Sequence, residues 1–332
     1  FQDNVKKFLE DQLTLDTVRK ITEGEDDLAK EELHKGLINL GINNILVPEE
    51  HGGLGLDLLF ATAVSQSLGE GVATLPFLGP YILAPTAIKY GASDSQKEKL
   101  FADMSQNLIN FGIGFSEYFG SRDSSGLNIS DNKVTGKTLF VLDTDFASHV
   151  MIADNKGQIG IVSLDSNDIE MIDLTTVDKT RTYKEMHFSD TPIEILDKTK
   201  SSSFAIEMAL DAGRIIAAAD SLGASQAMIN KAVEYSKERK QFNRVIGSFQ
   251  AVKHMCAEMA AELEPCYSLV WHAAHSFDDS SEDARLMACL AKSHISEVSK
   301  MVSKKATEVH GGMGFTDLLG LHFWFKRIGL NR

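Results

Sequence analysis

An arginine and an aromatic residue lie close together near residue 240, in a segment whose chemistry suits a phosphate. The segment reads Glu238-Arg239-Lys240-Gln241-Phe242. A guanidinium presents a planar fork that matches two phosphate oxygens, and a neighbouring ring can shield one side of that contact. A dinucleotide diphosphate is therefore one possible ligand. The alternative is a solvated helix end, because the helix dipole favours cations there whatever the function.

Three glycines in four positions form a second candidate site, Gly311-Gly312-Met313-Gly314, directly after His310. Bare backbone lets a ligand approach closely, and a following helix would offer its N-terminal amides to a phosphate. The simpler explanation is a helix C-cap with a tight turn. No predicted strand precedes the glycines, so they do not form a Rossmann fingerprint.

Asp211 and Arg214 form a third candidate site in the apolar stretch 204–222. They are three residues apart and share one face if the stretch is helical, so they could pair with each other. Burying charge among Ala, Ile, Leu and Met is costly without further partners. A polar ligand that passes this face is the alternative.

The apolar periodicity predicts an α+β fold with three domains that position these residues. Residues 1–106 have helical spacing, and residues 107–197 contain seven short β-rich runs without intervening helices. The second pattern predicts a small β barrel or sandwich. Helical spacing returns over residues 198–332 and predicts a four-helix bundle. The predicted strands are 111–115, 133–142, 149–153, 158–164, 169–172, 183–188 and 193–196, and the long helical blocks are 203–239, 248–277, 282–310 and 318–327.

Composition excludes several classes of protein. The 332 residues are 43% hydrophobic, which is enough for a large core, and the formal net charge of -14 disfavours nucleic acid and anionic membranes. No stretch reaches the length of a membrane span. Cys256, Cys266 and Cys289 show no metal-ligand spacing. We therefore expect a cytoplasmic protein with no metal site, no membrane insertion and no nucleic-acid partner.

Four motifs occur in order within this predicted architecture, namely EEHGGLG at 49–55, ERKQF at 238–242, IGSFQAVKH at 246–254 and VHGGMGFT at 309–316. With them the chain resembles the acyl-CoA dehydrogenase family over nearly its whole length. The resemblance implies an FAD-dependent enzyme that desaturates an acyl-CoA thioester between Cα and Cβ, as in the β-oxidation of fatty acids or steroid side chains. It further implies an electron-transfer flavoprotein as electron acceptor and a tetramer built as a dimer of dimers.

The resemblance also assigns roles to individual residues. The clamp on the neighbouring subunit's FAD diphosphate is assigned to Arg239, Gln241 and Phe242. The contacts near the adenosine half of that FAD are assigned to Gln250, Gly311 and Gly312. The contacts to the flavin ring are assigned to Phe140 and Ser116. The contacts to the pantetheine and acyl portion of CoA are assigned to Asp211 and Arg214.

The chain departs from the family pattern around the flavin. Leu142 replaces a Thr that hydrogen-bonds to the flavin, and only Ser116 and Glu117 match the usual T-E-P-G-x-G-S-D segment. Asn243 replaces a Gly, and Glu308 replaces a Gln before the glycine motif. The catalytic base is unknown, because one family position corresponds to Gly213 and the other would lie beyond Arg332.

Two explanations of these departures compete. The chain could be the degenerate subunit of a hetero-oligomer, lending residues to a partner's FAD, or a homomeric enzyme whose base lies elsewhere. Heteromeric family members resemble this chain in having shortened subunits. A non-catalytic acyl-CoA-binding module is the alternative from another functional class.

Overall fold

A computed structural model describes residues 2–332, and their contacts divide the chain into two compact units. One, called here the helical unit, comprises Phe1–Leu33, Leu58–Thr74 and Arg214–Arg332. The other, the sheet unit, comprises His34–Asp57 and Leu75–Gly213. The boundary falls within the long helix α7 (Phe204–Glu238). The predicted three-domain division at residues 106 and 197 stays a prediction.

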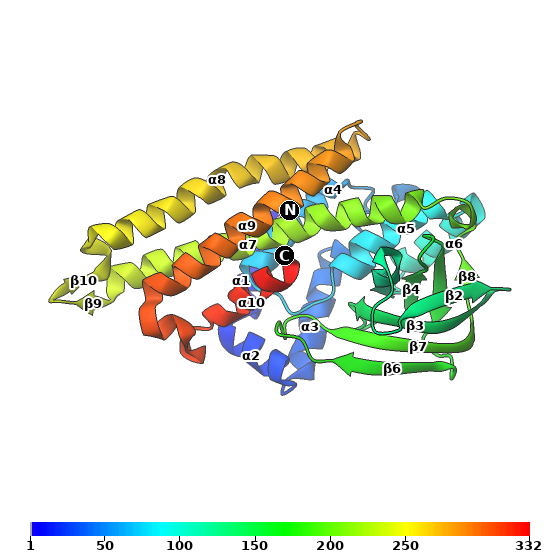
Figure 1. The fold of residues 1–332 in the computed structure, drawn as a ribbon, viewed down its shortest axis with the longest axis horizontal. Coiled ribbons are helices and arrows are strands. Elements are labelled where there is room, and N and C mark those ends of the chain that lie inside the picture. The colour runs from blue at the N-terminus through cyan, green and yellow to red at the C-terminus, as the bar shows by residue number, and fades with distance from the viewer. Residues whose placement is uncertain (1) are drawn as a thin grey trace. The chain divides into compact units, whose positions relative to one another are not determined.

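Helices precede and follow the strands along the chain, as the periodicity predicts (Figure 1). The long blocks predicted after residue 198 are confirmed as helices, with ends that differ by at most four residues. The helices are α1 (Gln2–Gln12), α2 (Leu15–Glu23), α3 (Asp27–Asn39), α4 (Leu58–Glu70), α5 (Ala84–Gly91), α6 (Asp94–Ser105), α7 (Phe204–Glu238), α8 (Gln250–Asp278), α9 (Ala284–His310) and α10 (Leu321–Asn331).

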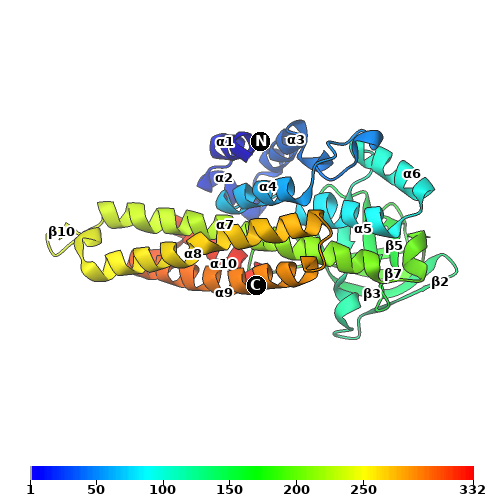
Figure 2. The same cartoon turned by 90° about the horizontal axis from the view of Figure 1, so that it is seen from above.

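Two glycines allow α4 and α7 to approach closely in the helical unit. A Cβ atom added at Gly69 would lie 2.0 Å from the Asp220 carbonyl oxygen, and one at Gly223 would lie 1.9 Å from that of Gln66. No side chain can occupy such distances, so the backbones themselves are in contact. Within this unit, α8, α9 and the part of α7 after residue 213 run alongside one another in both views (Figures 1 and 2). The core of the unit is built on this crossing.

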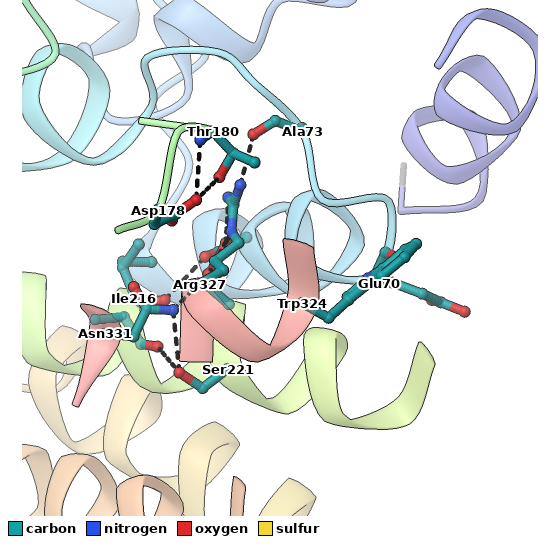
Figure 3. Close-up of polar contacts among 12 residues, drawn as sticks. Glu70, Ala73, Asp178, Thr180, Ile216, Ser221, Trp324, Arg327 and Asn331 are labelled. Atoms are coloured by element: carbon teal, nitrogen blue, oxygen red, sulfur yellow. Dashed lines mark hydrogen bonds and ion pairs between the residues drawn. The ribbon is translucent and has the colours of Figure 1, made fainter. Parts of the chain in front are cut away.

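A buried ion pair ties α10 to the same crossing (Figure 3). The Arg327 guanidinium donates to both Asp220 carboxylate oxygens, at 2.7 to 3.1 Å, and its Nη1 donates to the Ala73 carbonyl at 2.6 Å. Asn331 donates to the Asp220 carboxylate at 2.5 Å and to the Ser221 hydroxyl at 3.1 Å. Both charged side chains are buried. Asp220 therefore has a structural role, and α10 is fixed to α7 and to the chain after α4.

The sheet unit contains one mixed sheet of eight strands, in the order β6-β7-β3-β1-β4-β5-β8, with β2 paired to β3. β1 and β4 are parallel, with Phe111 opposite His149, and the other pairs are antiparallel. Its strands are β1 (Phe111–Gly114), β2 (Gly126–Ser130), β3 (Lys133–Leu142), β4 (His149–Ala153), β5 (Ile159–Ser163), β6 (Ile169–Leu174), β7 (Tyr183–Pro192) and β8 (Glu194–Ile195).

All seven predicted strands are present, and β2 is an eighth that the sequence analysis missed. Leu127 and Ile129 alternate with polar residues in β2, but two apolar residues next to a run of serines and aspartates give too short a pattern. The mixed helix-and-sheet class is confirmed. The finer architecture of a closed barrel or sandwich and a four-helix bundle stays a prediction.

None of the helices in residues 2–332 is both long enough and apolar enough to cross a membrane. Over the same residues, no group of three or more His, Cys, Asp or Glu side chains could hold a metal ion.

The buried ion pair predicts a large loss of stability when one partner is removed. Arg327→Met leaves the Asp220 carboxylate buried without its cation, and we expect the free energy of unfolding to fall by about 3–5 kcal/mol. Arg332→Met is the matched control, because its ion pair with Glu297 is exposed and should contribute no more than about 1 kcal/mol. Urea denaturation measures both. Equal, small losses would contradict a central role for Arg327.

Candidate functional site

A buried carboxylate joins two segments of the sheet unit beside the predicted flavin residues. Glu117 lies in the turn Ser116–Phe119 and is buried. It accepts hydrogen bonds from the Ser116 hydroxyl at 2.8 Å, the Leu139 amide at 3.0 Å and the Thr138 hydroxyl. The Ser116 hydroxyl also lies 2.5 Å from the Leu139 carbonyl oxygen. The turn is therefore held against β3 immediately before Phe140.

Phe140 has an unusual backbone conformation at this point. Its φ is +54°, and the pairing of β3 with β7 shifts register between Thr138 and Val141. A bulge of this kind re-aims a side chain, and a bulky residue at positive φ is strained. The Phe140 ring is 46% exposed. The two neighbouring residues that bond to Glu117 hold the bulge in place.

Ser116 and Phe140 line the same cavity, which has a volume of about 320 Å³. Its walls are mostly apolar, with one cation from Arg122 and the phenol of Tyr183. Burial raises the pKa of Tyr183 above its ordinary value. The apolar lining residues include Leu83, Ile113, Phe115, Leu139, Leu142 and Leu210. An aromatic ring system suits such walls, so the residues present fit a flavin ring, although Leu142 offers it no hydrogen bond.

The cavity has no carboxylate that is free to act as a base. Glu117 is the sole carboxylate among the described residues that line it, and three donors already bind its oxygens. At Gly213, the family's base position, an added Cβ would lie 2.9 Å from the Leu83 Cδ2 atom. Leu83 therefore fills the space that a side chain at 213 would enter.

Leu83 is itself held by an unusual turn. Residues Gly79–Leu83 form one turn of π-helix, a feature often found at functional sites. The Gly79 amide donates to the Asp143 carboxylate at 2.7 Å, at the end of β3. Burial raises the pKa of Asp143, and the Gly79 amide opposes that rise. This contact fixes the turn that carries Leu83, a residue of the cavity wall.

The predicted diphosphate clamp lies in the helical unit, where α7 ends in a short hairpin. β9 (Lys240–Gln241) pairs with β10 (Arg244–Val245) through the two-residue loop Phe242-Asn243. Both loop residues have positive φ, +52° and +62°. Asn tolerates this conformation better than other non-glycine residues, which explains why Asn243 can replace Gly. Arg239, Gln241 and Gln250 are exposed, and the Phe242 ring is 87% exposed.

The glycine turn adjoins the same end of α7. The rings of Tyr235 and His310 stack with centroids 4.5 Å apart, which joins the last turns of α7 and α9. Gly311 is the C-cap of α9 with φ +58°, so the conformational explanation holds for it. Gly312 has no positive φ, and a Cβ there would meet no atom within 4 Å. The fold does not require glycine at 312. The Gly311 amide donates to the Glu308 carbonyl, so Gly312 is where the turn leaves open backbone for a ligand.

Asp211 and Arg214 fall on either side of the boundary between the units. Asp211 is buried, whereas Arg214 lines an open cavity of about 550 Å³ with Lys292 and Arg332. Burial, and then the positive charges of Arg214 and Arg332, lower the pKa of Lys292. Glu297 also lines this cavity and pairs with Arg332, so Arg214 and Lys292 are the cations that would favour an anionic or carbonyl oxygen. The Asp211–Arg214 ion pair remains the alternative.

Of the predicted residues, Ser116 and Phe140 are brought together in one cavity. A contact of Arg239 with Gly311 and Gly312 stays a prediction, although Tyr235 and His310 join the ends of the two helices that precede them. The sequence analysis missed the roles of Thr138 and Leu83. Nothing in the sequence around Thr138 indicates that its hydroxyl binds Glu117, because the pattern there predicts only a strand. Leu83 follows two prolines and a glycine within nine residues, a pattern that indicates irregular backbone but not a cavity wall.

Comparison with known families decides the class of the protein. The N-terminal domain of acyl-CoA dehydrogenases matches residues 1–107, and the C-terminal domain of the same family matches residues 204–332. This chain belongs to the acyl-CoA dehydrogenase family. The predicted class of enzyme, an acyl-CoA dehydrogenase, is therefore confirmed, and the acyl substrate is left unspecified.

Individual relatives and structures agree with this assignment. A short-chain specific acyl-CoA dehydrogenase from Megasphaera elsdenii is 28% identical over 86% of this chain and 81% of its own length. Subunit CarC of the caffeyl-CoA reductase-Etf complex from Acetobacterium woodii is 25% identical, covering 93% and 86%. The fold is similar to that of the ChsE4-ChsE5 complex from Mycobacterium tuberculosis, with a TM-score of 0.87, 20% identity and coverage of 99% and 90%.

The positive φ of Phe140 predicts that glycine is a more stable replacement than alanine at this position, the reverse of the usual order. Phe140→Gly should be more stable than Phe140→Ala by about 1 kcal/mol, because glycine alone adopts positive φ without strain. Phe119, in the same cavity but without positive φ, is the control, and there Ala should be the more stable replacement by about 0.5–1 kcal/mol. Chemical denaturation of the four variants tests this. A preference for Ala at both positions would show that the bulge stores no strain.

Proposed function

We propose that this acyl-CoA dehydrogenase is an FAD-sharing subunit of a hetero-oligomer, a dimer of dimers whose FAD lies at the interface between subunits. It would act on an acyl-CoA thioester and pass electrons to an electron-transfer flavoprotein. Bound FAD would accept the hydride from the β-carbon of the thioester. The observation that carries the proposal is Gly312, which the fold does not require to be glycine and which leaves bare backbone just after α9. The last residue of α9, His310, stacks on Tyr235, one turn before Arg239.

The residues of this chain would bind rather than transfer protons. Arg239, with Gln241 and Phe242, would contact the diphosphate of FAD, with Gln250 and the amides of the glycine turn near the adenosine. All are exposed and therefore available to a ligand that a second subunit also binds. Phe140 and Ser116 would contact the flavin ring, and Arg214 and Asp211 would contact CoA.

The absence of a base among the residues that line the described cavity favours a partner subunit. Leu83 occupies the space at Gly213, and Glu117 is engaged by three donors. A partner subunit could supply both the base and the missing flavin hydrogen bond. The CarC relative is named as a subunit of an Etf complex, and the ChsE4-ChsE5 structure as a complex, which is consistent with shared assembly. We also propose that residues 107–197 form a small barrel and that residues 198–332 form a four-helix bundle.

A homomeric enzyme and an acyl-CoA-binding module without flavin are the alternatives. Flavin absorbance of the purified chain, alone and coexpressed with the product of a neighbouring dehydrogenase-like gene, separates them. We expect colour only in the coexpressed complex. Colour in the chain alone would indicate a homomeric enzyme, and no colour in either would indicate the binding module. Either result overturns the proposal.

Substitutions at the clamp should lower FAD retention without unfolding the protein. Arg239→Ala removes a charge-assisted contact, and we expect FAD affinity of the assembled complex to fall by about 1.5–3 kcal/mol. Gly312→Ala should leave the melting temperature unchanged, because its Cβ meets nothing, yet weaken FAD binding by blocking the backbone. Lys237→Met, exposed on the same helix, is the charge control. FAD affinity that is unchanged in both Arg239→Ala and Gly312→Ala would remove this end of α7 from the cofactor site.

A further inference from the structure

The helical unit contains a second cavity that shares no residue with the proposed flavin and CoA contacts. It has a volume of about 300 Å³, within the lower range of small-molecule sites. Residues of α1, α2, α4, α7 and α10 form its walls. The apolar members are Leu9, Leu13, Leu15, Val18, Val72 and Trp324.

A lysine without an acidic partner projects into these apolar surroundings. The Lys231 Nζ lies 4.5 Å from the centroid of the Trp324 ring, over its face. Burial lowers the pKa of Lys231, and no charge from another described residue offsets this effect. The cavity contains two carboxylates, but Glu70 pairs with Lys6 at 3.0 Å and Glu10 is exposed. A half-buried ammonium whose main contact is an aromatic face is therefore left short of negative charge.

The Trp324 side of the cavity is rigid, as a preformed site requires. The Trp324 indole donates to the Glu70 carbonyl at 2.9 Å, and Arg327, one turn later, donates to the Ala73 carbonyl (Figure 3). These two bonds bracket Val72, whose φ of +49° is rare for a β-branched residue. Strained backbone that the surroundings hold in place is a recurrent feature of binding sites.

We infer that this cavity binds an amphipathic monocarboxylate, with its carboxylate at Lys231 and its hydrocarbon chain against Leu9, Leu13 and Trp324. Among the described residues that line the cavity, the cations are Lys6 and Lys231, and Lys6 pairs with Glu70, which leaves Lys231 to bind one negative charge. The apolar walls favour an aliphatic chain rather than a polar body. The volume suits a chain of medium length. This site is independent of the proposed flavin site.

Sodium octanoate is the probe, and Trp324 is the reporter. The chain has two tryptophans, so Trp271→Phe leaves Trp324 as the sole tryptophan, which can be excited selectively over the tyrosines. In that background we expect saturable fluorescence changes on addition of octanoate. Lys231→Met, which keeps an unbranched chain but removes the charge, should weaken binding at least about tenfold, as expected for a charge-assisted contact. Octanamide, the neutral analogue, should bind the unsubstituted site correspondingly weakly.

Two further variants control the experiment. Lys237→Met removes the same charge from the exposed side of α7 and should leave octanoate affinity unchanged. Ala227→Leu fills the cavity from α7 and should abolish binding while Lys231 is retained. Circular dichroism confirms that each variant is folded. No saturable octanoate binding, equal affinity for octanoate and octanamide, or an affinity unaffected by Lys231→Met would each overturn the inference.

Discussion

The ion pair between Asp220 and Arg327 is the interaction on which the helical unit depends. It lies where α4 and α7 touch through Gly69 and Gly223, so close that only backbone fits between them. A buried carboxylate at such a crossing would be very unfavourable without a cation. Arg327 provides that cation and also binds the Ala73 carbonyl, so one side chain fixes three segments that are distant in sequence.

This arrangement has consequences at both ends of α10. Trp324, one turn before Arg327, binds the Glu70 carbonyl and forms a wall of the Lys231 cavity. In the preceding segment, the glycine turn follows α9, whose last residues pack on α7 through Tyr235 and His310. Helices that are held rigidly in this way can present exposed groups such as Arg239 and the Gly312 amide with defined geometry. Precise presentation is what a cofactor shared between subunits requires.

The sequence predicts the elements of this fold much better than it predicts the sites. Helical and alternating apolar spacing predicted the long helices and seven strands, because burial of one face imposes that spacing. The four motifs indicated the family. Contacts between distant residues left no such pattern, since Asp220 and Arg327 are 107 positions apart and Lys231 meets Trp324 only in three dimensions. The sequence drew attention to Gly312 but could not tell whether the turn or a ligand requires glycine there. The open space around Gly312 in the structure shows that the turn does not require it.

The sheet unit carries an apolar cavity with a strained aromatic residue and, among the described residues that line it, no carboxylate available as a base, whereas the helical unit carries an exposed cationic end. A site that is completed by a second subunit reconciles the two. The stoichiometry of FAD in the assembled, coexpressed complex tests this most directly. One FAD for every two protein chains is the predicted result. One FAD for each copy of this chain, bound without a different partner subunit, would contradict the account.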